Sequence, residues 1–190
     1  MKKSLYILII LIFSSCNKNI KTPKAAVVSA RIEASKIGAQ ILEKGGTAFD
    51  AMIATNFALA VCFPNAGNIS GGGFMVYRKK NGEIGSIDYR EMAPLKAHEK
   101  MFQNKFGEVL PEKSTKGGLA VGVPGTIAGL FEIHRKFGTL PIEDLIKPSI
   151  DLAKNGFVVT EGQKSSLESK RSEFIEVNGE KTFYAKKIKK

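Results

Sequence analysis

The stretch from Ala51 to Phe63 constrains the fold most, because a helix built from it is apolar nearly all round. A helix without a polar face has to be covered on several sides, so we expect it in the middle of a packed layer. Thr47 and Asp50, three residues apart, resemble a capping box that opens this helix, and Pro64 ends it. The rest of the chain must therefore assemble around this segment.

The neighbouring segments predict a mixed α/β protein. Residues 34–42 carry apolar side chains at helical spacing, and Gly45-Gly46 closes that helix where a left-handed residue is needed. Residues 74–77 and 84–89 have the composition of strands, and Asn81-Gly82 between them is typical of a hairpin turn. The sequence thus predicts two packed helices followed by a β-hairpin.

Two more helices are predicted downstream. The first runs from Thr126 to Phe137 and is closed by Gly138, and the second runs from Pro141 to Lys154. The last thirty residues are polar and weakly periodic, and they end in a lysine-rich run. The whole pattern indicates an α/β fold in an incomplete domain.

Residues 1–15 have the layout of an export signal. Two lysines follow Met1, residues 5–13 carry no charge, and a pair of serines precedes Cys16. The apolar run is too short to span a bilayer as a stop-transfer helix.

Small residues before a cysteine resemble the lipobox of bacterial lipoproteins, so we expect Cys16 to carry lipid and residues 16–24 to form a polar tether. The protein would then be an exported cell-envelope lipoprotein, facing the periplasm or attached to the outer membrane. An ordinary signal with a coincidental cysteine is the alternative.

Cys62 is the only other cysteine. If Cys16 is acylated, neither an intramolecular disulfide nor a cysteine-based zinc site is available. Cys62 lies within an apolar run, so we expect a buried core thiol rather than a nucleophile.

The formal charge of +11 could in principle reflect a nucleic-acid partner, but the distribution of the lysines favours a solvated basic surface. Removal of Lys2 and Lys3 with the signal would leave +9. The remaining lysines are mostly scattered, no aromatic residues interleave with them, and no nucleic-acid-binding motif is present. A lipid-anchored chain would instead meet a membrane surface through its anchor.

The sequence lacks the motifs of several common types of active and binding site. Gly71 to Gly73 is not followed by the lysine of a phosphate loop, and Pro124 does not suit a dinucleotide-binding turn. His98 and His134 have no partner at metal-ligand spacing, so a zinc site is not expected and both are interpreted as surface residues. No G-x-S-x-G elbow is present.

Four unusual stretches occur in a particular order, with the sequences EKGGTAFDA, SGGGF, DYREMAP and GLAVGVPGT: Glu43–Ala51, Ser70–Phe74, Asp88–Pro94 and Gly118–Thr126. This series resembles the amino-terminal half of the large subunit of γ-glutamyltransferases, also called glutathione hydrolases. The resemblance runs over about residues 25–159. Each stretch is weak evidence alone, but the four in this order and spacing are specific.

The resemblance implies a partial N-terminal-nucleophile αββα sandwich, with residues 25–184 as the amino-terminal part of the large subunit. In that family a precursor cleaves itself and exposes a threonine at the start of the small subunit. The threonine hydroxyl attacks the γ-glutamyl carbonyl of glutathione or a related compound, with its own α-amine as general base. Water or an acceptor amine then releases the γ-glutamyl group. The family needs no metal or cofactor.

Arg90 is the residue that the resemblance assigns to substrate binding. The family's equivalent arginine holds the α-carboxylate of the glutamyl donor, and a planar guanidinium suits a carboxylate because it offers a bidentate fork. The alternative is a structural salt bridge to Glu91 or Asp88. We interpret Glu91 as a support that orients Arg90, and the glycines of residues 71–73 as allowing close backbone packing.

The catalytic threonine of the family has no counterpart here. Thr47 and Thr126 are interpreted as helix caps. None of the eight threonines lies in a Thr-Thr-His-like processing stretch: Thr22, Thr47, Thr55, Thr115, Thr126, Thr139, Thr160 and Thr182. The resemblance also fades after about Tyr184, and residues 185–190 form a basic tail that suggests a truncation or frameshift. We therefore expect the chain to be inactive without its partners, the remainder of the large subunit and the small subunit.

Two other functions remain open from the sequence. One is a related amidase, such as a cephalosporin acylase, which shares the family's architecture. The other is a lipid-anchored binding module that has no catalytic activity. Arg90 within its motif favours a γ-glutamyl substrate.

Overall fold

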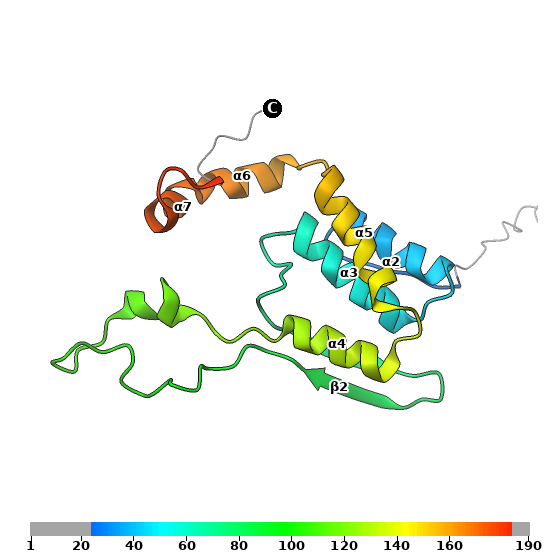
Figure 1. The fold of residues 1–190 in the computed structure, drawn as a ribbon, viewed down its shortest axis with the longest axis horizontal. Coiled ribbons are helices and arrows are strands. Elements are labelled where there is room, and N and C mark those ends of the chain that lie inside the picture. The colour runs from blue at the N-terminus through cyan, green and yellow to red at the C-terminus, as the bar shows by residue number, and fades with distance from the viewer. Residues whose placement is uncertain (1–23, 184–190) are drawn as a thin grey trace, which may run out of the picture.

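The computed structural model describes residues 24–183, so Cys16, the leader and the basic tail lie outside the described residues. Six helices, one β-hairpin and two short 3₁₀ turns occur in this part of the chain (Figure 1). Their order is α2 (Ile32–Glu43), α3 (Ala48–Cys62), β1 (Phe74–Arg78), β2 (Ile84–Asp88), η1 (Pro111–Ser114), η2 (Gly118–Ala120), α4 (Thr126–Phe137), α5 (Ile142–Asn155), α6 (Glu161–Ser169) and α7 (Arg171–Asn178).

Helix α3 lies at the centre of the core, as its apolar sequence predicted. It packs against α2, α4 and α5 (Figure 1). Ile53, Ala54 and Ala58 of α3 are fully buried, and Ile41 of α2 and Leu145 of α5 pack into the same cluster. The helix begins three residues before the predicted stretch and ends at Cys62, whose thiol is buried as expected.

Asp50, in the first turn of α3, is a fully buried carboxylate that joins two distant segments. Its Oδ2 accepts hydrogen bonds from the backbone N–H and the hydroxyl of Thr47, both at 2.8 Å, which completes the predicted capping box. The same carboxylate accepts from the backbone N–H of Thr139 at 3.0 Å and from the Thr139 hydroxyl at 2.7 Å. The start of α3 is thereby bonded to the connection between α4 and α5.

The β-hairpin forms with the predicted turn. Strands β1 and β2 are antiparallel, with Phe74 opposite Asp88 and Arg78 opposite Ile84. Gly82 adopts a φ of +90°, the left-handed conformation for which the sequence supplied a glycine. The inner face of the hairpin packs on the helices, whereas its outer face exposes three apolar side chains: Phe74, Val76 and Ile84.

Helices α4 and α5 also lie where the sequence predicted them, and Pro148 falls inside α5. The polar segment after Asn155 contains two helices that the weak periodicity did not reveal. Helix α6 opens with a capping box formed by Thr160 and Gln163. Since neither α6 nor α7 contains a buried residue, neither shows the apolar stripe on which a helix prediction depends.

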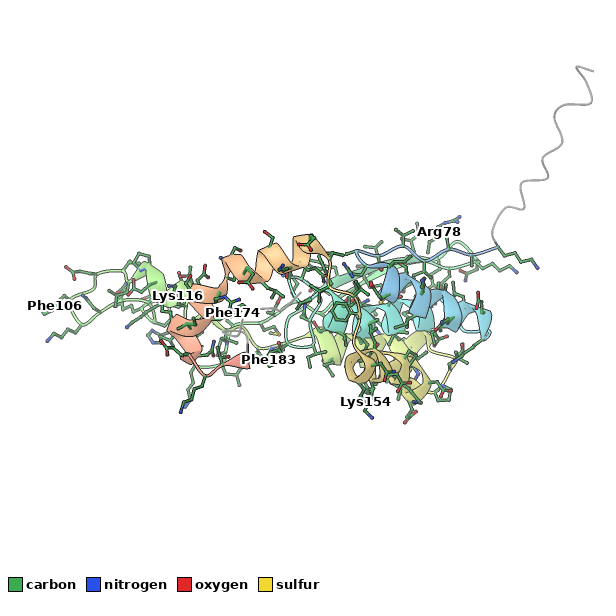
Figure 2. All side chains as sticks on the ribbon, turned by 90° about the horizontal axis from the view of Figure 1, so that it is seen from above. Arg78, Phe106, Lys116, Lys154, Phe174 and Phe183 are labelled. Carbon is green, nitrogen blue, oxygen red and sulfur yellow. The ribbon has the colours of Figure 1, made fainter. Side chains whose placement is uncertain are left out.

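A long arm extends from the helical core between β2 and α4 (Figure 2). At its base Met92 and Val123 exchange backbone hydrogen bonds of 3.1 and 2.8 Å. Phe106 lies at the far end of the arm, away from Arg78 of the hairpin. Further back, the Lys116 ammonium lies 3.1 Å from a carboxylate oxygen of Glu176 in α7, so the arm and the last helix contact each other.

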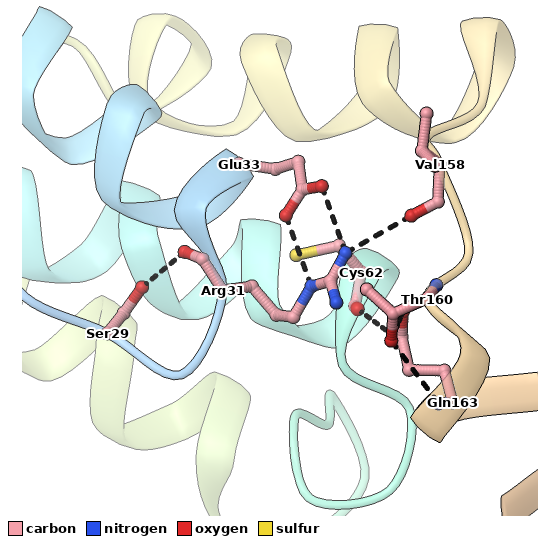
Figure 3. A network of polar contacts seen from close by, with 7 residues as sticks. All are labelled: Ser29, Arg31, Glu33, Cys62, Val158, Thr160 and Gln163. Carbon is pink, nitrogen blue, oxygen red and sulfur yellow. Dashed lines mark hydrogen bonds and ion pairs between the residues drawn. The ribbon is translucent and has the colours of Figure 1, made fainter.

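A polar network joins the beginning of α2 to the segment between α5 and α6 (Figure 3). The Arg31 guanidinium donates to both carboxylate oxygens of Glu33 and, at 3.2 Å, to the carbonyl of Val158. Nearby, the Gln163 amide donates to the carbonyl of Cys62 at 2.7 Å. These bonds hold the segment that enters α6 against the beginning of α2 and the end of α3.

We predict that Asp50→Asn lowers the free energy of unfolding by about 2–3 kcal/mol at neutral pH, because an amide NH₂ cannot accept the bonds that one carboxylate oxygen receives. Urea unfolding of both proteins measures the difference. Asp151→Asn is the matched control, since Asp151 forms an exposed pair with Lys147 on α5 and should contribute little.

The loss of unfolding free energy in Asp50→Asn should depend on pH. Burial alone would raise the pKa of Asp50, but the hydrogen bonds from Thr139 and Thr47 outweigh it and hold the pKa below its usual 3.8. A lowered folded-state pKa means that the contribution is complete above the unfolded value and is lost as the pH falls through the folded value. The gap between wild type and Asp50→Asn should therefore narrow below about pH 3.8; a gap that stays constant would contradict this account.

Candidate functional site

Arg90 lies two residues beyond the end of β2, where the chain leaves the hairpin. The backbone N–H of Arg90 donates to a carboxylate oxygen of Asp88 at 2.9 Å, which fixes this turn. The guanidinium lies over the Phe74 ring, 5.6 Å from its centroid, and the Arg90 side chain is 65% exposed. The arginine therefore emerges from a fixed backbone onto the surface of the molecule.

The guanidinium makes no close salt bridge in the part of the chain that the structure describes. Its Nε lies 4.0 Å from a carboxylate oxygen of Glu91, which is too long for a hydrogen bond. Asp88, the other partner considered from the sequence, bonds to the backbone of Arg90 rather than to its side chain. The donors of Arg90 are thus open to an incoming acceptor, and Glu91 is near enough to influence their orientation.

The backbone of Arg90 runs through a narrow trough whose first wall is the glycine loop, residues 71–73. Tyr89 and Gly73 exchange backbone hydrogen bonds of 3.0 and 3.4 Å. A Cβ on Gly72 would lie 2.7 Å from the Cα of Arg90 and 2.6 Å from the Glu91 nitrogen, closer than real Cβ contacts. Glycine here allows the close backbone packing that the sequence predicted.

The second wall is the segment that enters α4. A Cβ on Gly125 would lie 2.1 Å from the carbonyl oxygen of Tyr89, and one on Gly129 would lie 2.3 Å from the Tyr89 ring. Burial of that ring raises the pKa of Tyr89. Beyond Arg90, the bonds between Met92 and Val123 continue this wall. Arg90 is thus enclosed at the backbone and exposed only at its side chain.

Thr126 does not cap α4, which corrects the sequence prediction. Gly125 occupies the N-cap position, and Thr126 is the first helical residue and is buried. Its hydroxyl donates instead to the side-chain oxygen of Asn68 at 2.6 Å. Asn68 has no clear signature in the sequence, because its partner is 58 residues away. An asparagine three residues before a glycine is the only local signal.

A cleft of about 300 Å³ lies beside the trough, on the side of α3. Asn56 and Leu59 of α3 line it together with Asn68, Phe74 and Tyr89. Arg90 is not among its lining residues. The guanidinium lies outside this cleft, on a side chain that is largely exposed.

Six of the eight threonines use their hydroxyls in structural hydrogen bonds: Thr47, Thr55, Thr115, Thr126, Thr139 and Thr160. Thr22 lies outside the described residues. The two histidines differ from each other. His98 is exposed, whereas His134 is half-buried and bonds through Nε2 to the carbonyl of Leu140 at 2.8 Å, so it is not simply a surface residue.

Two further findings concern residues 24–183, one on metal ligands and one on membrane spans. No group of three or more histidine, cysteine, aspartate or glutamate side chains in this range could hold a metal ion. None of the helices in the same range combines the length and apolar character needed to cross a bilayer.

The fold of the described residues occurs in known enzymes. The structure superimposes on Helicobacter pylori γ-glutamyltranspeptidase with a TM-score of 0.80 and 46% identity, over 84% of this chain and 46% of that one. The Pseudomonas nitroreducens γ-glutamyltranspeptidase gives a TM-score of 0.75 and 42% identity, over 86% and 48%. The chain is thus an α/β unit of the type found in γ-glutamyl-processing enzymes.

The sequence comparisons agree. The family model for gamma-glutamyltranspeptidase matches residues 34–189. The Escherichia coli K12 glutathione hydrolase proenzyme is 41% identical over 156 residues, which are 82% of this chain and 27% of that protein. The chain belongs to the gamma-glutamyltranspeptidase family, which confirms the resemblance seen in the four sequence stretches. It spans about a quarter of the length of the curated relatives.

We predict that Gly72→Ala displaces the backbone of Arg90, because the added methyl group meets backbone atoms that cannot rotate away. The free energy of unfolding should fall by about 1–3 kcal/mol, and the amide resonances of Arg90 and Glu91 should shift in a two-dimensional NMR spectrum. Gly118→Ala is the control, since its Cβ would meet nothing within 4 Å. Equal effects of the two substitutions would contradict the tight trough.

Proposed function

We propose that this chain supplies the donor-binding arginine of an enzyme that transfers or hydrolyses γ-glutamyl groups, with glutathione and related compounds as substrates. The proposal rests on the fixed backbone and the exposed guanidinium of Arg90. Its backbone is fixed between two glycine-lined walls, while its guanidinium is exposed and forms no hydrogen bond to a carboxylate in residues 24–183.

The chemistry of Arg90 suits the α-carboxylate of a γ-glutamyl donor. A guanidinium presents parallel N–H groups that match the two oxygens of a carboxylate, so it fixes the orientation of the donor as well as its charge. Phe74 lies against the guanidinium and limits the directions in which it can point. An anchored α-carboxylate would place the γ-carbonyl at a defined distance from Arg90, where a nucleophile can reach it.

We infer that the nucleophile comes from outside the 190 residues. The family mechanism uses a threonine with a free α-amine, and none of the threonines here lies in a processing stretch of that kind. The chain alone would therefore be inactive, since positioning without a nucleophile forms no acyl-enzyme. Its partners would be the remainder of the large subunit and the small subunit.

The outer face of the hairpin supports a larger sheet assembly. Phe74, Val76 and Ile84 are exposed apolar side chains on one face of two paired strands. In an αββα sandwich a second sheet stacks on such a face at a spacing of about 10 Å. We propose that this face is covered in the intact enzyme and that the chain forms one part of the sandwich.

We also propose that the protein is exported and anchored in the cell envelope through lipid on Cys16. The basis is the leader and the pair of serines before the cysteine. Mass spectrometry of the mature protein tests this, because a diacylglycerol-modified Cys16 at the amino terminus has a distinctive mass. An unmodified Met1 or Cys16 would contradict the anchor.

A cephalosporin-acylase-type amidase is the alternative activity. The Bacillus halodurans cephalosporin acylase superimposes with a TM-score of 0.64 but is only 23% identical, so that likeness shows the fold alone. The exposed guanidinium favours a substrate that carries a free carboxylate near the scissile amide. A non-catalytic binding module is the remaining possibility and is distinguished by a lack of turnover.

We predict that Arg90→Lys raises the KM for a chromogenic γ-glutamyl anilide by about tenfold and changes kcat less, because lysine keeps the charge but loses the fork. The measurement uses the complete product of the gene that encodes this chain. Arg78→Lys is the control, since Arg78 is an exposed arginine of the same hairpin, at the end of β1.

The outcomes separate the hypotheses clearly. Absence of turnover in the wild-type product would overturn the proposed enzyme and leave the binding module. An unchanged KM in Arg90→Lys, with activity present, would remove Arg90 from donor binding. Turnover by the 190-residue chain itself would show that it contains its own nucleophile.

A further inference from the structure

We propose that Asn68 is a positioning residue for Arg90, which it serves by fastening together the two walls of the trough. The proposal rests on the donor-binding role of Arg90 proposed above. Asn68 precedes the glycine loop, and its side chain bonds to Ala66, Gly71 and Thr126 rather than to the guanidinium. It acts through the backbone segments that enclose Arg90.

The side-chain oxygen of Asn68 accepts two hydrogen bonds. One comes from the backbone N–H of Gly71 at 2.7 Å, and the other from the hydroxyl of Thr126 at 2.6 Å. The carbonyl of Gly71 in turn accepts from the backbone N–H groups of Gly125 and Thr126, at 2.8 and 3.0 Å. The glycine loop and the start of α4 are therefore joined by a closed set of bonds.

These bonds require an acceptor with two lone pairs at this position. An amide or carboxylate oxygen meets that requirement, and an aliphatic side chain does not. The Asn68 NH₂ group donates to the carbonyl of Ala66 at 3.2 Å, which sets the direction of the oxygen. Without the oxygen, the hydroxyl of Thr126, a residue only 4% exposed, would lose its partner.

Movement of either wall would reach Arg90 directly. A Cβ on Gly72 would collide with the Arg90 Cα, and a Cβ on Gly125 would collide with the Tyr89 carbonyl oxygen, so neither position has room for a methyl group. If the walls separate, the backbone between Tyr89 and Glu91 is free to shift. Since the guanidinium is exposed, this backbone and the Phe74 ring are the main restraints on its position.

The experiment compares Asn68→Leu, which removes the acceptor at similar volume, with Asn68→Asp, which keeps it. Thr126→Val removes the hydroxyl donor alone. Asn65→Leu is the matched control, because Asn65 lies in the same loop but bonds to Ser166 of α6. Two readouts are used: ¹⁵N relaxation of the Arg90 amide in the 190-residue chain, and steady-state kinetics of the complete gene product with a γ-glutamyl anilide.

We expect Asn68→Leu to lower the order parameter of the Arg90 amide and to raise KM about tenfold with kcat nearly unchanged. Asn65→Leu should behave like wild type in both readouts. Asn68→Asp keeps the acceptor but loses the bond to the Ala66 carbonyl, so it should change both readouts less than Asn68→Leu does. Thr126→Val should reproduce part of the effect, and Asn68→Leu/Thr126→Val should be no worse than Asn68→Leu alone. A purely structural role would instead reduce the amount of folded enzyme and leave KM unchanged.

The proposal is overturned if Asn68→Leu folds and neither the order of Arg90 nor KM changes, or if Asn65→Leu changes both equally. If Asn68→Leu does not fold, Thr126→Val decides by the same criteria. An inactive wild-type product would remove the proposed enzyme, and the relaxation data would then decide whether Asn68 positions Arg90. The two failures are therefore distinguishable.

Discussion

The buried carboxylate of Asp50 is the interaction on which the rest of the structure depends. Its Oδ2 accepts from the backbone N–H and the hydroxyl of Thr47 at the start of α3 and from the hydroxyl of Thr139, and its Oδ1 accepts from the backbone N–H of Thr139. An unpaired carboxylate in a dry core would be strongly unfavourable, so both segments must be in place together. The central helix and the connection between α4 and α5 are thus fixed by one side chain, and the hairpin packs on the surface they create.

The site depends on close backbone contact rather than on a deep pocket. Gly72 and Gly125 enclose the chain on either side of Arg90, and neither position has space for a side chain. The ring of Tyr89 extends this packing onto Gly129 of α4. Such contacts fix the backbone while they leave the guanidinium in solvent. This arrangement suits an arginine that binds a small carboxylate contributed from outside the chain.

Much of the fold follows from local patterns. The capping box of Thr47 and Asp50, the Asn81-Gly82 turn and the apolar stripes of α2, α4 and α5 each specify an element by themselves. The prediction failed at α6, which has a capping box but no buried apolar stripe. It also failed at Thr126, where a local helix cap was the simplest interpretation but a partner 58 residues away determines the hydrogen bond.

The sequence by itself determined the family and the central place of α3, and it singled out Arg90 as a candidate, because these depend on apolar periodicity and on motifs contained within a few residues. Only the tertiary structure decided that Asp50 also binds Thr139, that Asn68 joins the glycine loop to α4, and that Glu91 is too far from the guanidinium for a hydrogen bond. Bonds between residues distant in the chain have no local signature. They arise from the way packed elements are brought together, and side-chain spacing alone does not encode that arrangement.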